Sequence, residues 1–353
     1  YGFFPSGAIA WRISEENFLN MVEWIDEIKV RASMGKTGTQ SIGDHMWRTL
    51  YSPVSYGDKN ALIPTQLGND KIKWESTVQK DLGLDFSFMR GRLGGTFGYY
   101  HKVTDGTLLN MTPAPSSSYS TVVFNIAKIR NQGLEFDIHG DFIRKKDFRW
   151  TGNLNISRNV SKVLDINGGP FSDPNDRDAM NLGTSVVKEG EPLGLLYGRV
   201  ATGIIKTQAQ LEAAREEFSL WTIFDPYLNL GDIAYEYEDG FWKEDVIGHA
   251  TPDFFGGYTN TINWNRFTLT ALFTFSYGND LIYQKDVSDS GMSSLANRGT
   301  RVLNHYSEDN TSSNRPRSMW ATTYMLSSLN VYDASYLKLK TLSLSYNLPE
   351  SIC

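Results

Sequence analysis

The chain has 353 residues, and its 34 basic against 40 acidic side chains give a formal net charge of −6, which argues against nucleic acid as a partner. Aromatic residues make up 13% of the chain and glycine contributes 31 residues, a balance that favours strands and turns over helices. The single cysteine, Cys353, excludes an intrachain disulfide framework, and no stretch approaches the ~18 consecutive apolar residues of a membrane-spanning helix.

Alternating apolar and polar residues, which are typical of half-buried strands, recur from the start of the chain. Weak alternation near residues 3–13 and 28–34 predicts the first two strands. A hairpin follows over residues 82–103, where a tight turn near Arg90 and Gly91 joins two alternating segments.

The next predicted hairpin, over residues 133–157, divides its two faces clearly. Its first strand places Leu134, Phe136, Ile138 and Phe142 on one face. A short polar turn separates it from the second strand. The opposite, polar face of the hairpin carries Glu135, Asp137, His139, Asp141, Asn153 and Asn155.

Further strands follow toward the end of the chain. Residues 253–278 predict a third hairpin with the cleanest alternation, and residues 193–205 predict a weaker strand. The strand predicted over residues 335–348 changes phase, because Leu339 is odd-numbered and Leu342 is even-numbered. We interpret this change as a β-bulge or a change of environment.

Turns of a few residues alternate with connections of tens of residues, which are rich in aromatic residues and are therefore expected to be ordered. Thr207 with Gln210 three positions later forms a capping box, which predicts a short loop helix. The long connections lie near residues 36–71, 104–124, 166–187, 206–250 and 279–332.

Alternation alone does not say whether the apolar face meets a protein core or lipid, and a soluble sandwich or jelly roll is the alternative. Three features favour a membrane β-barrel, whose strands need only ~9–11 alternating residues. The polar faces are uniformly hydrophilic, aromatic residues gather at strand ends, and short turns alternate with long loops.

Seven segments, in order along most of the chain, resemble the C-terminal half of the SusC/RagA family of TonB-dependent outer-membrane transporters. They are FFPSGAIAWRISEENF, IKVRASMGKTG, IKWESTVQKDLGLDFSFMRGRLGGTFGYYHKVTDGTLL, IRNQGLEFDIHGDF, GEPLGLLYGRV, IGHATPDFFGGYTNTINWNRFTLTALFTFSYGND and ASYLKLKTLSLSYNLP.

The resemblance implies an all-β, antiparallel, up-and-down transmembrane barrel of about 22 strands, with long extracellular loops, in the outer membrane of a Gram-negative bacterium. It also implies an N-terminal plug domain, a SusD-like surface lipoprotein as a lid, energy from the TonB-ExbB-ExbD system, and import of glycans or peptides. No cofactor is implied.

Residues 1–353 are expected to form a partial barrel domain. Only about ten strands are predicted, too few to close a barrel of the family's diameter. The plug, the first strands and the final strand have no counterpart in the sequence, so we expect a fragment. The acidic loop 232–245 lacks the family's calcium-ligand spacing and is expected to be a solvated loop.

The polar row from Glu135 to Asp141, with Asn153 and Asn155, is the candidate ligand-binding part of the lumen wall. Carboxylates two positions apart on a strand lie ~6.6–6.8 Å apart, which overlaps the separation in inverting glycosidases, but no feature indicates the burial that would raise one pKa. We therefore predict no catalytic residue and no metal site.

Aromatic residues in the long connections are the second set of candidates, because sugar rings stack on such side chains. Packing between loops or contact with the lid are the alternative roles. These residues are Trp47, Tyr51, Tyr56, Tyr119, Trp221, Tyr227, Trp320 and Tyr324.

The sequence thus favours a segment of a nutrient importer, without enzymatic activity, that contacts outer-membrane lipid and a glycan or peptide cargo. A soluble β-rich carbohydrate-binding or adhesin domain is the rival hypothesis, and a polysaccharide-degrading enzyme is a more distant one.

Overall fold

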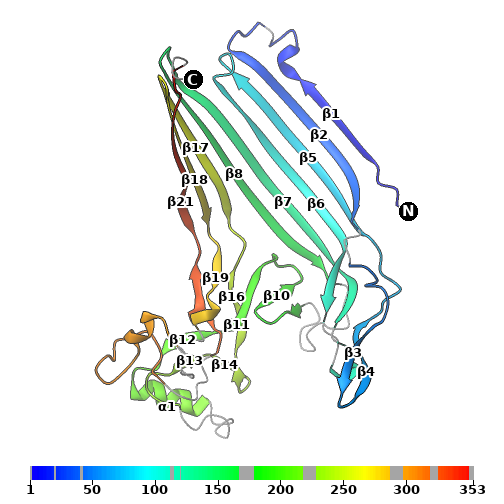
Figure 1. Cartoon of the computed structure of the whole chain (residues 1–353), viewed down its shortest axis with the longest axis vertical. Coiled ribbons are helices and arrows are strands. Elements are labelled where there is room, and N and C mark those ends of the chain that lie inside the picture. Colours follow the sequence, from blue (N-terminus) through cyan, green and yellow to red (C-terminus); the bar gives the residue numbers. More distant parts are fainter. Residues whose placement is uncertain are drawn as a thin grey trace.

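The computed structural model describes residues 2–19, 21–39, 43–111, 115–119, 121–166, 179–217, 228–286, 297–318 and 325–349. Nine strands pair antiparallel in chain order to form the main sheet, which is the up-and-down arrangement that the sequence predicts (Figure 1). They are β1 (Ser6–Arg12), β2 (Ile25–Thr39), β5 (Glu75–Phe88), β6 (Leu93–Met111), β7 (Thr121–Arg144), β8 (Phe148–Asp165), β17 (Phe254–Trp264), β18 (Phe267–Tyr277) and β21 (Tyr336–Tyr346).

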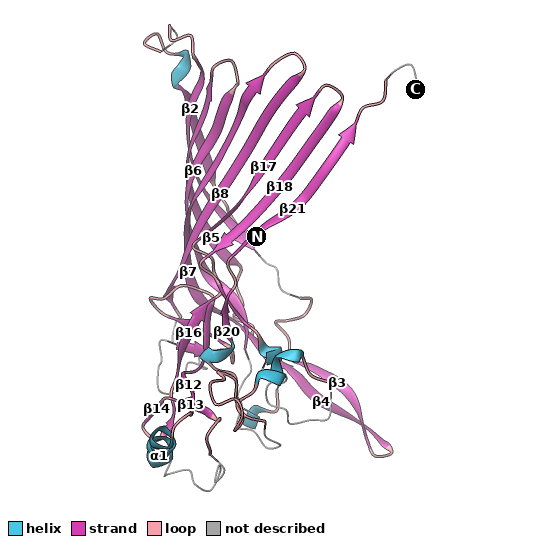
Figure 2. Cartoon of the chain, turned by 90° about the vertical axis from the view of Figure 1, so that its left-hand side faces the viewer, coloured by secondary structure: helices cyan, strands magenta, loops and turns pink. Residues whose placement is uncertain are grey.

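Short turns lie at one end of the main sheet and long connections at the other, as Figures 1 and 2 show. We name these the turn end and the loop end. The turn between β5 and β6 uses three consecutive residues with positive φ, Met89, Arg90 and Gly91, and Asn265 has a φ of 51° in the turn between β17 and β18. The predicted hairpin turns are therefore confirmed.

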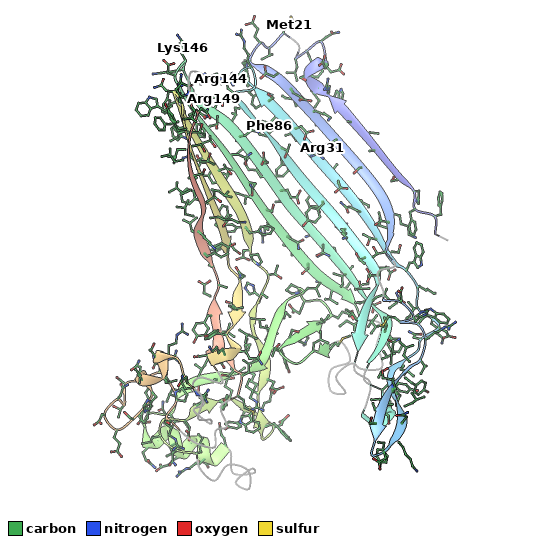
Figure 3. All side chains as sticks on the ribbon, in the orientation of Figure 1. Met21, Arg31, Phe86, Arg144, Lys146 and Arg149 are labelled. Atoms are coloured by element: carbon green, nitrogen blue, oxygen red, sulfur yellow. The ribbon has the colours of Figure 1, made fainter. Side chains whose placement is uncertain are left out.

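The register of the main sheet separates an apolar face from a polar face. Because side chains alternate with period two, a continuous register keeps residues of one kind on one side. Figure 3 labels Phe86, on the apolar face, and Arg31, on the polar face. One row of cross-strand partners on the apolar face runs Trp11, Val30, Leu84, Phe97, Phe136, Ile156, Gly256, Phe275 and Leu337.

No second layer of the described chain covers the apolar face. Leu82 is 56% exposed, Leu134 44% and Leu337 74%. The buried hydrophobic clusters of the described residues lie instead at the loop end, for example around Ile126 and Val163 or around Ile204 and Tyr306. A sandwich or jelly roll would cover the apolar face with another sheet, so the structure contradicts that alternative.

The predicted phase change near the end of the chain is a β-bulge. Leu272 pairs with Thr341, whereas its neighbour Phe273 pairs with Leu339. Lys340 is therefore the extra residue on β21, and it shifts the apolar positions from odd to even numbers without moving them off their face.

The loop end contains small sheets of its own and the β3–β4 hairpin, which joins the edge of the main sheet through β7. Two of these features depart from the sequence predictions. The strand predicted over 193–205 is two strands in separate small sheets, not part of the main sheet, and the predicted connection 36–71 contains a hairpin. The elements are β3 (Leu50–Tyr56) with β4 (Lys59–Leu67), β9 (Ala179–Asn181), β10 (Ser185–Lys188), β11 (Leu195–Arg199) and β16 (Glu244–His249), β12 (Ala201–Ile204) with β13 (Ile233–Tyr235), β14 (Tyr237–Glu238) with β15 (Phe241–Trp242), and β19 (Asp280–Ile282) with β20 (Val331–Asp333).

The predicted loop helix is α1 (Gln208–Glu217). The Gln210 backbone N–H donates to Thr207 Oγ1 at 3.3 Å, and the Thr207 N–H donates to Gln210 Oε1 at 3.1 Å, which confirms the capping box. Short 3₁₀ turns lie at Ile13–Glu15, Pro115–Ser117, Thr300–Asn304 and Ser328–Asn330. Within the described ranges, no helix has the length and hydropathy to cross a membrane.

Candidate functional site

The polar face holds, in the half of β7 and β8 nearer the turn end, a small cluster of Asp137, His139 and Asn153. Asn153 Nδ2 donates to both carboxylate oxygens of Asp137 at 3.3 Å, and His139 Nδ1 lies 3.9 Å from Asp137 Oδ1. The side chains of His139 and Asp137 are 55% and 40% exposed. The cluster therefore offers an accessible carboxylate, amide and imidazole to hydroxyl or amide groups of a ligand.

A glycine on the neighbouring strand makes room for His139. Gly94 pairs with His139 across β6 and β7, and a Cβ on Gly94 would lie 2.7 Å from His139 Nε2. The imidazole thus lies over bare backbone, in a position that a larger residue on β6 would obstruct.

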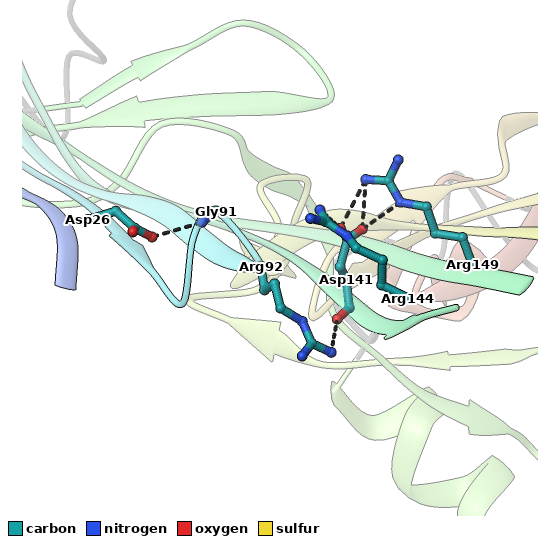
Figure 4. A network of polar contacts seen from close by, with 6 residues as sticks. All are labelled: Asp26, Gly91, Arg92, Asp141, Arg144 and Arg149. Atoms are coloured by element: carbon teal, nitrogen blue, oxygen red, sulfur yellow. Dashed lines mark hydrogen bonds and ion pairs between the residues drawn. The ribbon is translucent and has the colours of Figure 1, made fainter. Parts of the chain in front are cut away.

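Asp141, at the turn end of the same strand, has a different environment. Its side chain is 5% exposed and accepts hydrogen bonds from Arg149 Nε at 3.1 Å and Nη2 at 3.0 Å, and from Arg144. The Asp141 carbonyl oxygen accepts a further bond from Arg92 Nη2 at 3.3 Å (Figure 4). This carboxylate is occupied in holding the β7–β8 hairpin, and little of its hydrogen-bonding capacity is left for a ligand.

A shallow pocket connects the open cluster with the Asp141 network. It has a volume of about 240 Å³, and its lining includes His139, Asp141, Asn153 and the hydroxyl-bearing residues Thr259 and Thr261. Three of the six predicted wall residues therefore share one concavity.

Glu135 and Asn155 lie farther along the polar face, and glycines stand opposite both. Gly98 pairs with Glu135, and Gly257 pairs with Asn155. Glu135 and Asn155 are exposed. Because the glycines have no side chains, the surface beside Glu135 and Asn155 is open. Among the described residues, no hydrogen bond joins Glu135 or Asn155 to the Asp137 cluster.

A second polar cluster, on β2 and β5, is absent from the sequence-based candidates. Arg31 Nε lies 3.1 Å from Asp85 Oδ1, and Lys29 Nζ lies 3.6 Å from Asp85 Oδ2. Ser33 Oγ donates to Asp81 Oδ2 at 3.1 Å. The signal was present, because alternation puts these residues on the polar side of their strands, but only the pairing of β2 with β5 brings them together.

The loop aromatics divide into those that the structure places and those that it does not describe. Tyr51 and Tyr119 lie together and share a hydrogen bond between their side chains, which raises the pKa of Tyr119. Trp47 is 46% exposed with the Arg48 guanidinium 4.5 Å from its ring centroid, and Tyr56 is 81% exposed at the tip of the β3–β4 hairpin. The remaining candidates, Trp221, Tyr227, Trp320 and Tyr324, lie outside the described residues.

A buried amide fixes the base of this aromatic region. Gln66 is 5% exposed, and its Nε2 donates to the carbonyl oxygens of Met46 at 2.8 Å and Arg48 at 2.9 Å. These bonds hold the segment that carries Trp47 against β4.

Two carboxylates of the acidic loop 232–245 pair with basic side chains of the protein, Asp232 and Glu236. Asp232 accepts bonds from Arg317 Nε at 2.7 Å and Nη2 at 3.0 Å. Glu236 accepts a bond from Lys243 Nζ at 3.2 Å, which raises the pKa of Lys243. In the part of the chain that the structure describes, no three His, Cys, Asp or Glu side chains are grouped to hold a metal ion.

Comparison of the sequence with known proteins identifies similar β-barrels. The family model described as TonB dependent receptor-like, beta-barrel matches residues 1–271. TonB-dependent receptor P3 of Formosa agariphila is 34% identical over 361 residues, which cover 99% of this chain and 35% of that protein. TonB-dependent receptor SusC of Bacteroides thetaiotaomicron is 36% identical over 184 residues, 49% of this chain and 18% of that protein.

The fold is also similar to that of a solved transporter. A structure of the RagAB peptide transporter superposes with a TM-score of 0.78 and 22% identity, covering 99% of this chain and 37% of the matched chain. Both matches cover nearly all of this chain. The chain thus spans about a third of the length of each of these two receptors.

Proposed function

This chain belongs to the TonB-dependent receptor family of Gram-negative outer-membrane transporters and forms part of its β-barrel, and from that premise we propose that it takes part in importing oligosaccharides or peptides. Its main sheet supplies part of the barrel wall, and the elements at its loop end supply extracellular surface. The family transports and is not enzymatic, so the polar clusters bind cargo and perform no covalent chemistry.

The observation that carries this proposal is the division of one sheet into two unlike faces. The apolar face is uncovered, with Leu134 and Phe142 44% and 49% exposed. The polar face, by contrast, presents the partly exposed cluster of Asp137, His139 and Asn153. A wall between lipid and a water-filled lumen requires this arrangement.

The cluster at Asp137 suits a cargo rich in hydroxyl or amide groups. A carboxylate accepts hydrogen bonds from both, whereas the imidazole can donate or accept. Carbohydrates and peptide backbones share this chemistry, so the site supports oligosaccharides and peptides equally.

Partners follow from the same proposal. The relative of known structure is described as RagAB and as a peptide transporter, and we propose a comparable SusD-like lipoprotein seated over the loop end, where Trp47, Tyr51 and Tyr56 are exposed. Energy would come from the TonB-ExbB-ExbD system through a plug, with residues 1–353 acting as one part of the barrel domain.

The test is uptake by the full-length receptor in a host that lacks its own copy. Replacing Asp137 and Asn153 together with alanine removes two ligand groups, and at ~0.5–1.5 kcal/mol per hydrogen bond we expect initial uptake at limiting cargo to fall ~5-fold or more. Fluorescent oligosaccharide and peptide libraries are the probes.

Asp147→Asn is the matched control, because Asp147 lies exposed in the turn between β7 and β8, away from the polar face. We expect wild-type uptake from it. Absence of TonB-dependent uptake of every oligosaccharide and peptide by the wild-type receptor would refute the proposed cargo class.

A further inference from the structure

The apolar face carries a row of basic side chains near the loop end. Lys36, Lys80 and His101 belong to β2, β5 and β6, and the others to β7 and β8. Each lies on the same face of the sheet as the apolar residues of its strand. Lys80, for example, is two positions from Leu82, on the side of the loop end. We name this set the basic rim: Lys36, Lys80, His101, Arg130, Arg158 and Lys162.

The positions of the basic rim along the strands match the boundary of a membrane on the side of the loop end. Lys80 and Phe88 are eight residues apart on β5, which at ~3.4 Å per residue and a strand tilt of ~40° corresponds to a height of ~21 Å. Lys162 and Trp150 are twelve residues apart on β8, which gives ~31 Å. The apolar band of an outer-membrane barrel is ~25 Å tall, so the basic rim brackets its outer boundary.

Like charges face one another in this rim. Arg130 pairs directly with Lys162, and Lys80 pairs directly with His101. A pair of cations such as Arg130 and Lys162 destabilises a sheet. None of the six side chains has a hydrogen-bond or ion-pair partner among the described residues, and Arg130 Nε is buried without a partner in that part of the chain.

Carboxylates do not compensate these charges from the membrane side. Between the turn end and the basic rim, the described apolar face of β2 and β5 to β8 carries no Asp or Glu. Asp105 lies at the level of the rim, opposite Ser76, and the described residues provide it with no ion pair. An anionic group from outside the chain would therefore meet net positive charge.

An apolar groove adjoins the basic rim on the same face. Its volume is about 850 Å³, and Lys80 and His101 are part of its lining. Small residues such as Ala32 form its floor, while Ile9 and Leu82, 77% and 56% exposed, are among its apolar walls.

We propose that the groove and the basic rim bind a phosphorylated lipid of the outer leaflet. An acyl chain occupies the groove, and the phosphate lies among the cations at its loop-side end. Basic side chains next to an apolar surface are the usual recognition chemistry for anionic headgroups. The cost of placing cations opposite one another is offset when a shared anion lies between them.

The experiment uses the full-length receptor, purified in detergent and titrated with bis-phosphorylated lipid A, with lipid occupancy read by native mass spectrometry. Each Lys or Arg near an anionic headgroup contributes ~1 kcal/mol, so Lys80→Gln should raise the Kd ~5-fold and the triple variant Lys80→Gln/Arg130→Gln/Lys162→Gln at least ~10-fold.

Lys102→Gln is the matched control, because Lys102 follows His101 on β6 and lies on the polar face opposite Gln79. We expect its affinity for lipid A to equal that of the wild type. Wild-type receptor should also bind fully dephosphorylated lipid A at least ~10-fold more weakly, a comparison that needs no variant to fold. Equal binding of the two lipids, or equal losses from Lys80→Gln and Lys102→Gln, would overturn the proposal.

Discussion

Asp286 illustrates how single buried groups organise the loop end. It is 4% exposed, and it accepts hydrogen bonds from Arg315 Nη1 at 3.1 Å and from the Tyr332 hydroxyl at 2.9 Å. The three residues come from separate parts of a long connection that the sequence predicts to be ordered. A buried carboxylate needs such partners, because an unpaired one would be costly to desolvate.

Alkaline pH is expected to loosen this part of the loop end. Burial, and then the neighbouring Asp286 carboxylate, raise the pKa of Tyr332, with smaller opposing effects from Arg315 and Arg301. A raised pKa in the folded state means that the stabilisation is complete below the unfolded value of about 10 and is lost as pH rises through the folded value. The protection factors of residues 328–333 in the full-length receptor, which compare each amide's exchange rate with its intrinsic base-catalysed rate, should therefore fall above about pH 10.

Tyr332→Phe should remove this pH dependence, at the cost of one hydrogen bond at neutral pH. Tyr56→Phe is the matched control, because Tyr56 is 81% exposed at a hairpin tip. If the Tyr332→Phe receptor kept the full alkaline loss of protection, another group would have to be responsible.

The polar-face candidates show how far sequence reasoning reaches at the scale of residues. Alternation alone put Glu135, Asp137 and His139 on one face, and their exposure agrees with a wet wall. Asp141 differs because Arg144 and Arg149 cover it. That contact depends on a register shift between Asp141 and Ile143 beside the turn, which period-two reasoning does not contain.

At the scale of elements, the sequence predicts those features whose signal lies within a few consecutive residues. The capping box of Thr207 and Gln210 and the bulge at Lys340 belong to this kind. The β3–β4 hairpin was not predicted, since the sequence analysis treats residues 36–71 as a connection. Pro53 and Pro64 within it are residues that argue against interior strands. Proline is tolerated in this hairpin, since β4 meets the main sheet through only two residue pairs with β7.

The cap of α1 provides a test at this scale. Thr207→Ala removes the side-chain oxygen that accepts the Gln210 N–H, and loss of an N-cap costs ~1 kcal/mol. Amide hydrogen exchange over residues 208–217 should accelerate ~5-fold in the full-length receptor. Glu216→Ala, an exposed change in the last turn, should leave exchange in the first turn unchanged; equal acceleration in both variants would show that the cap has no special role.

At the scale of the whole molecule, the two faces of the main sheet have to meet different solvents. The aromatic side chains near the turn end fit this requirement. The ring centroids of Trp264 and Phe267 are 6.4 Å apart, and those of Phe267 and Tyr346 are 4.7 Å apart. These three residues lie on three neighbouring strands. Aromatic residues in such a belt are typical of a membrane interface. Sequence alone predicted the alternation, whereas the absence of a covering layer is a property of the assembled sheet.

Phe136→Arg tests this division directly. Phe136 lies on the apolar face, six residues from Phe142 at the turn end, which places it ~16 Å above that end and close to the middle of the apolar band. An arginine there costs ~2–4 kcal/mol in an outer-membrane barrel, so we expect much less folded receptor in the membrane, measured by heat-modifiable mobility of extracted outer membranes. Glu135→Arg, the same new side chain one position away on the polar face, should assemble at wild-type levels. The contrast between adjacent residues is the decisive measurement, because a defect of strand β7 would affect both variants, whereas lipid on one side and water on the other penalises only Phe136→Arg.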